Sequence, residues 1–101
     1  MDELLTWLKS QHNGLRTYKD FQQRVLHLAT TDREHVALYQ ILGLLVGRFI
    51  DSYEEHPLTG DVADQAFDHL IAFTERATAS LRAPAAEQLA TLNAIAAADL
   101  G

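Results

Sequence analysis

The sequence predicts an all-α fold, a compact antiparallel bundle of four main helices with a short N-terminal helix as the fifth. Every extended stretch repeats its apolar residues at helical spacing, and none alternates as a half-buried strand does. Only 5 Gly and 2 Pro interrupt the 101 residues, so the breaks between helices stand out. With 48 % apolar and 22 % charged residues, the chain has the composition of one soluble domain, 1–101, with its own core.

The first two predicted helices are separated by Asn13 and Gly14, residue types that readily close a helix. The first helix covers about 2–11 and is short. The second is expected to begin at Thr17, because Thr17 and Asp20 have the spacing of a capping box. Its apolar residues then recur at intervals of 3, 4 and 3, which predicts one buried stripe: Tyr18, Phe21, Val25 and Leu28.

The third predicted helix is long and covers about 32–56. Thr31 and Glu34 have capping-box spacing at its start, and Pro57 bars the residue before it from helical geometry. A helix of about 25 residues is roughly 37 Å long. Its apolar arc is too wide for one neighbour to cover, so we expect it to be the central column of the core: Leu38, Ile41, Leu42, Leu45, Val46, Phe49, Ile50 and Tyr53.

The fourth predicted helix follows a loop at 57–60 and has Asp61 as its N-cap. The last helix begins near Pro84, a residue favoured at a first helical position. Between residues 83 and 98, 8 of 16 residues are alanine. Such a segment forms a helix readily but buries little area per residue. We therefore expect the Ala-rich last helix, in 83–101, to be mobile or to dock late.

Charge is distributed unevenly along the chain. Residues 1–48 carry a net charge of +1 and residues 49–101 carry −7, and no Lys or Arg lies between Arg48 and Arg76. Carboxylates without nearby cations repel one another, and a basic partner would relieve that repulsion. The gap predicts either a solvated face or a docking surface for a basic protein, and its candidate residues are Asp51, Glu54, Glu55, Asp61, Asp64 and Asp68.

Two glycines, Gly43 and Gly47, lie in the middle of the predicted third helix. Each mid-helix glycine costs about 0.5–1 kcal/mol relative to alanine, so the pair indicates that another backbone approaches closely. One possibility is a crossing with the chain's own first or last helix. The other is self-association at this pair, and the wide apolar arc beneath a thin last helix leads us to expect a homodimer.

The titratable residues form no complete catalytic or metal-binding motif. The absence of Cys removes thiolate zinc sites and Cys nucleophiles, and no phosphate-binding glycine loop occurs. A di-iron bundle needs paired Glu-x-x-His motifs, for which Asp32-x-x-His35 is a single imperfect substitute. We expect no enzyme, no cofactor and no resident metal. A bundle that binds a metal or small ligand through His and carboxylate side chains is the alternative.

Membranes and nucleic acids are not expected partners. The longest uncharged apolar run, 36–47, has 12 residues, whereas a membrane span needs about 20. A net charge of −6 opposes binding to phosphate backbones and anionic lipids. Because the chain opens with Asp2 and Glu3 rather than a basic, apolar leader, we expect a cytoplasmic protein.

Glu55-His56-Pro57 followed by Thr59-Gly60-Asp61 resembles a short stretch of the small acidic helical colicin immunity proteins. The tyrosine pair that follows in those proteins is absent here, and the third helix is longer than theirs. The resemblance implies that a small acidic bundle can act by covering a basic site on another protein. We expect a non-enzymatic interaction module, an adaptor, inhibitor or subunit, with a structural homo-oligomer as a further alternative.

Overall fold

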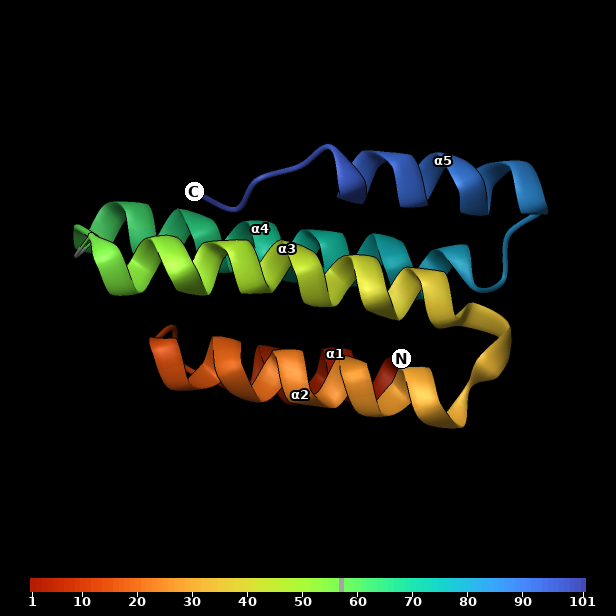
Figure 1. Ribbon diagram of the computed structural model, residues 1–101, viewed down its shortest axis with the longest axis horizontal. Helices are drawn as coiled ribbons and strands as arrows, with labels where there is room; N and C mark the ends of the chain where they lie inside the picture. Colours follow the sequence, from red (N-terminus) through yellow and green to blue (C-terminus); the bar gives the residue numbers. More distant parts are fainter. Residues whose placement is uncertain (57) are drawn as a thin grey trace.

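The helices run alternately up and down the bundle, which confirms the predicted all-α class (Figure 1). The computed structural model describes residues 1–56 and 58–101. No helix in this part of the chain is both long and apolar enough to cross a membrane. The described elements are α1 (Asp2–Lys9), α2 (Leu15–Thr31), the 3₁₀ turn η1 (Arg33–His35), α3 (Val36–Glu55), α4 (Gly60–Ser80) and α5 (Ala85–Ala96).

Four antiparallel helices and a covering helix make up the bundle, and α2 and α3 pack together most closely (Figure 1). In this view α2 and α3 lie in front, with α1 behind α2 and α4 behind α3, and α5 runs along the side of α3 and α4 that faces away from α1 and α2. The bundle measures 39 × 23 × 20 Å, and its radius of gyration is 13.0 Å. This radius is the value of about 13 Å expected for a folded body of this length.

The core is built around α3, as the apolar arc predicts. Leu42, Leu45 and Phe49 are buried there, in one apolar cluster with Tyr18 of α2 and Leu70 of α4. Each helix contributes the apolar side of its repeat and leaves its charged side in water. The confirmed position of α3 fixes which residues of the neighbouring helices face solvent.

The predicted start of the second helix is wrong. Helix α2 begins at Leu15, two residues before the expected start, and its N-cap is Gly14. Thr17 lies inside the first turn, where its hydroxyl donates to the carbonyl oxygen of His12 at 2.8 Å. Thr17 is therefore the third helical residue, and a residue inside the helix cannot be its N-cap.

The third helix is shorter than predicted. Thr31, expected to cap it, is the last residue of α2, and its hydroxyl donates to the carbonyl oxygen of Leu28 at 3.3 Å. The 3₁₀ turn η1 follows, so α3 begins only at Val36 and has 20 residues. With 21 residues α4 is one residue longer than α3, and the described bundle has two long helices rather than one.

The remaining boundaries differ from the prediction by one or two residues. Thr59, not Asp61, is the N-cap of α4, and its hydroxyl accepts a hydrogen bond from the backbone N–H of Val62 at 3.4 Å. Pro84 is the N-cap of α5 rather than its first helical residue. Pro57, the residue predicted to end the third helix, lies outside the described residues, and α3 ends at Glu55.

The chain after α5 returns over α3 and α4 (Figure 1). Ile95 and Leu100 are fully buried. The guanidinium of Arg48 donates to the carbonyl oxygen of Ala98 at 3.1 Å, and Nδ1 of His69 lies 3.2 Å from the carbonyl oxygen of Leu100. The docked position is thus held by two apolar anchors and two side chains from other helices; mobility of the Ala-rich segment stays a prediction.

Candidate functional site

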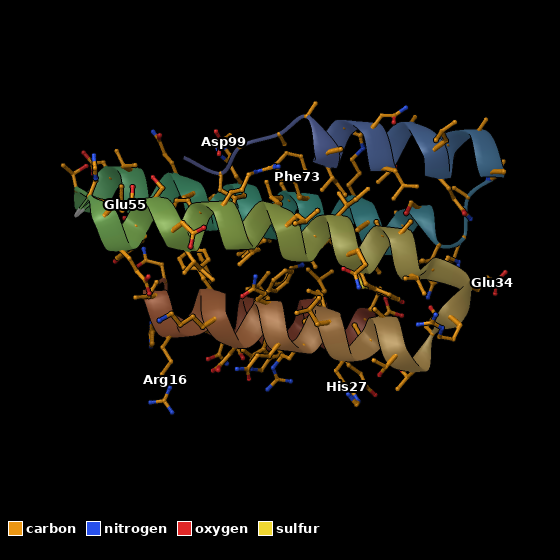
Figure 2. The ribbon with its side chains drawn as sticks, viewed as in Figure 1. Arg16, His27, Glu34, Glu55, Phe73 and Asp99 are labelled. Carbon is orange, nitrogen blue, oxygen red and sulfur yellow. The ribbon has the colours of Figure 1, made fainter. Side chains whose placement is uncertain are left out.

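The predicted acidic residues gather at one end of the bundle. They occupy the last turns of α3 and the first turns of α4, which lie together because these two helices are antiparallel (Figure 1). Glu55 marks this end in Figure 2. All six side chains are exposed. We call this surface the acidic end: Asp51, Glu54, Glu55, Asp61, Asp64 and Asp68.

Lysines from the first two helices reach part of the acidic half of the chain. Lys19 of α2 forms an ion pair with Glu54 at 2.8 Å, and Lys9 of α1 forms one with Glu75, outside the acidic end, at 3.2 Å. Each side chain is about half exposed, so each pair contributes only about 0–1 kcal/mol to stability. Two carboxylates from the segment without Lys or Arg are therefore paired with lysines from other helices.

Asp64 has a neutral partner instead. The side-chain amide of Asn13, in the turn between α1 and α2, donates to its carboxylate. Because Asn13 carries no charge, the negative charge of Asp64 stays uncompensated. Four other carboxylates of the acidic end have neither an ion pair nor a side-chain hydrogen bond within 1–56 and 58–101: Asp51, Glu55, Asp61 and Asp68.

The acidic end consists of two groups of carboxylates rather than one row. The group on α3 lies next to α2, where Asp51 and Gln22 border the same shallow groove. The group on α4 lies next to the α1–α2 turn, where Asp64 meets Asn13. A partner would therefore meet carboxylates from two helices, and each helix fixes the spacing of its own group.

A cluster of aromatic rings supports the acidic end from inside. The ring of Tyr18 lies 4.8 Å from that of Phe49, 6.4 Å from Tyr53 and 6.3 Å from Phe67, measured between centroids. The Tyr18 hydroxyl is buried and has no hydrogen-bond partner among the described residues. Burial, followed by the nearby Tyr53 and Asp64, raises the pKa of Tyr18, so this phenol stays neutral beneath the carboxylates.

Tyr18→Phe should leave the free energy of unfolding unchanged or raise it by up to about 1 kcal/mol, because an unsatisfied buried hydroxyl is costly. Urea unfolding measures the change. Tyr39→Phe is the matched control and should destabilise, since the Tyr39 hydroxyl donates to Asp32 at 2.7 Å. A loss of more than about 1 kcal/mol for Tyr18→Phe would mean that an internal water pairs with its hydroxyl.

A second cluster of titratable groups lies at the opposite end of α3. Each of three residues there offers one possible ligand atom, and these three atoms lie within 4.8 Å of one another: Asp32, Glu34 and His35. The same oxygen of Asp32 accepts hydrogen bonds from the Tyr39 hydroxyl at 2.7 Å and from Nδ1 of His35 at 2.8 Å. The Tyr39 bond first, and then the His35 bond, lower the pKa of Asp32. These bonds brace the η1 turn against α3.

The sequence identified only part of this second cluster. The three-residue spacing of Asp32 and His35 is visible as a pattern, but Glu34 and Tyr39 were not associated with it. The spacing of four between His35 and Tyr39 is the signal that could have added the tyrosine. The other described histidines lie elsewhere. His27, for example, lies on α2 and projects from the side of that helix away from α3 (Figure 2).

An open groove of about 770 Å³ lies between the start of α1 and the middle of α2. Its walls carry both signs of charge, with Asp20 and Arg24 among the lining residues and Leu4 and Leu28 on the apolar side. The guanidinium of Arg24 also lies over the Trp7 ring, 4.2 Å from its centroid. This stacking engages the charged group of Arg24 within the chain.

The glycine pair on α3 lies against α2, not against the first or last helix. A Cβ on Gly43 would lie 3.3 Å from Leu26 and 3.7 Å from Val25, and a Cβ on Gly47 would lie 2.8 Å from the amide nitrogen of Gln22. The close approach indicated by the glycines therefore occurs within the chain. Self-association at this pair stays a prediction.

Comparisons with protein-family models, with curated proteins and with solved structures find no match to this chain.

Proposed function

We propose that this protein is a non-enzymatic, cytoplasmic interaction module whose acidic end docks a basic site on another protein. It would act as an adaptor, an inhibitor or a subunit of a complex. The observation that carries the proposal is the set of four carboxylates at one end of the bundle without a partner among the described residues. Such a set is an electrostatic match for clustered Lys and Arg side chains.

The acidic end rests on a packed core, which suits a docking surface. The carboxylates stand on helices whose inner sides pack through the rings of Tyr18, Phe49 and Phe67. Their helices therefore do not need to be ordered when a partner arrives, which reduces the cost of binding.

Binding through such a surface should be fast and sensitive to salt. Exposed charge pairs contribute about 0–1 kcal/mol each, so no single carboxylate is expected to dominate the affinity. Their combined field acts mainly on the association rate. Because the Debye length is about 8 Å at physiological salt, a severalfold rise in salt should slow association markedly.

The alternatives have weaker support. A metal or small ligand at Asp32, Glu34 and His35 would compete with the two hydrogen bonds that one Asp32 oxygen already accepts. A structural homo-oligomer would not require an acidic end without compensating charges. Neither alternative explains why the carboxylates without partners lie together.

The test neutralises the unpaired carboxylates of the acidic end. The triple variant Asp51→Asn, Asp61→Asn, Asp68→Asn should lose most binding to a basic protein captured by the wild-type chain from its source cells. The matched control neutralises three exposed acidic residues outside the acidic end, Glu3→Gln, Glu34→Gln and Glu87→Gln, and has the same net charge. The control should bind like the wild type at equal salt.

Two results would contradict the proposal. If both triple variants weaken binding equally, net charge rather than the acidic end governs the interaction. If neither weakens it at low salt, the acidic end is a solvated face. Circular dichroism of both variants checks that the helices remain intact.

A further inference from the structure

Two large apolar side chains are exposed next to each other on the face formed by α2 and α3. Leu44 is 62 % exposed and Leu26 is 41 % exposed. They flank Gly43, because Leu44 is its chain neighbour and the Leu26 side chain lies 3.3 Å from the position of a Gly43 Cβ. We call the surface around them the α2/α3 face.

A groove of about 270 Å³ lies beside Leu44 on the same face. Gly43 and Gly47 line it together with Gln22, whose side-chain amide donates to the Gly43 carbonyl oxygen at 3.3 Å. The face thus carries a protruding apolar side chain and a concavity directly beside it. An interface between identical surfaces requires this self-complementary combination.

The α2/α3 face carries charges of both signs that balance one another, although the chain carries −6. Arg48 and Asp51 line the groove, and Lys19 and Glu54 form an ion pair between α2 and α3. A face without net charge lets two equally acidic copies approach each other. Its uncharged members are Gln22, Leu26, Gln40, Gly43, Leu44 and Gly47.

We infer that the α2/α3 face binds a second copy of this chain, with Leu44 of each copy in the groove of the other. Because the groove is lined by Leu44's own neighbours, reciprocal insertion places both Leu44 residues next to a two-fold axis. If the two α3 helices run antiparallel across this axis, the two acidic ends lie at opposite ends of the dimer. Their mutual repulsion is then small.

The available area fits a reversible dimer. A face about 30 Å long and about 20 Å wide follows from the 20 residues of α3 and the width of two helices, and it provides about 600 Å² per partner. This is near the lower limit for specific interfaces, which bury about 1,200 Å² in total. The inference goes beyond the proposed function. Asp51 borders the groove between the copies, whereas the α4 carboxylates of each acidic end stay free to bind a basic partner.

Sedimentation of the wild-type chain should show a concentration-dependent rise from 11.3 kDa to twice that mass. Leu44→Glu should raise the dissociation constant at least about 100-fold, because the substitution places two like charges at the axis. Leu89→Glu is the matched control, since Leu89 is 58 % exposed but lies on α5. The control should dimerise like the wild type.

A cysteine provides an independent positive test, because the chain contains none. In a glutathione redox buffer, Leu44→Cys should form a disulfide-linked dimer in high yield, since a disulfide needs Cα atoms within about 7 Å. Leu89→Cys should stay mainly monomeric under the same conditions.

A wild-type chain that sediments at 11.3 kDa up to millimolar concentration would overturn the inference. So would a dimer that survives Leu44→Glu but is lost in Leu89→Glu. Added salt separates this contact from the acidic end: it should leave dimerisation unchanged or strengthen it, whereas it should weaken binding of a basic protein.

Discussion

Phe49→Ala should lower the free energy of unfolding by about 3–5 kcal/mol, a large share of the about 5–15 kcal/mol available to a domain of this size. Phe49 is 3 % exposed, and its ring lies against Tyr18 at 4.8 Å and Tyr53 at 5.9 Å. Truncation removes these contacts and leaves a cavity between α2 and α3. The surrounding helices can close it only partly, because they are held along their whole length.

Urea unfolding measures the loss, and thermal unfolding should shift by more than about 10 °C, since 1 kcal/mol corresponds to about 4–8 °C in a chain of this length. Ser52→Ala is a suitable control, because Ser52 is exposed on the same helix. Its effect should stay within about 0.5 kcal/mol. A shift of only one or two degrees for Phe49→Ala would mean that α3 is not the column of the core.

Ile95→Ala should lower the free energy of unfolding by about 2–5 kcal/mol if α5 is docked in the folded chain. Ile95 is fully buried, although it belongs to the Ala-rich segment that the sequence predicts to be mobile or late to dock. Alanine at this position would leave Thr91 and Leu100 as the buried residues of the last segment. The helix would then lose most of its attachment to α3 and α4.

Leu89→Ala is the matched control on the same helix, because Leu89 is 58 % exposed. The control should be nearly neutral. Equal and small effects of both substitutions would contradict a docked α5 and support the expected mobility. Hydrogen exchange of the α5 amides provides the local measurement, and Ile95→Ala should accelerate it more than Leu89→Ala does.

The fold class and the core were predictable because both depend on the period of the apolar residues. Leu42, Leu45 and Phe49 fall on the apolar arc of the third helix, and all three are buried. The period depends only on residues near one another in the chain, so a single sequence suffices to identify it. The breaks at Asn13 and Gly14 were equally local.

The helix starts were predicted less well, because competing local patterns exist. The capping spacing at Thr17 is genuine, but its hydroxyl bonds to His12 and the helix begins two residues earlier. Thr31 likewise bonds backward to Leu28. A hydroxyl can serve either the helix that follows or the turn that precedes it, and the spacing does not distinguish the two.

The apolar and charge patterns of a single sequence did not predict contacts between residues that lie far apart in the chain. The gap without Lys and Arg is real in the sequence, but Lys19 reaches Glu54 across α2 and α3. Leu100, one residue from the end, is a core residue that no periodicity marks. The glycine pair predicted a close approach, but the approaching helix is α2. In each case tertiary packing decides the partner.

Cross-linking with a zero-length reagent that joins carboxylates to lysines tests the proposed docking of the acidic end most directly. Applied in an extract of the source cells and mapped by mass spectrometry, it should link a lysine-rich partner to Glu55, Asp61 and Asp68. The exposed acidic residues Glu34 and Glu87 serve as internal references. Links concentrated at the acidic end are the predicted result, and links spread equally over all exposed carboxylates would contradict the proposed function.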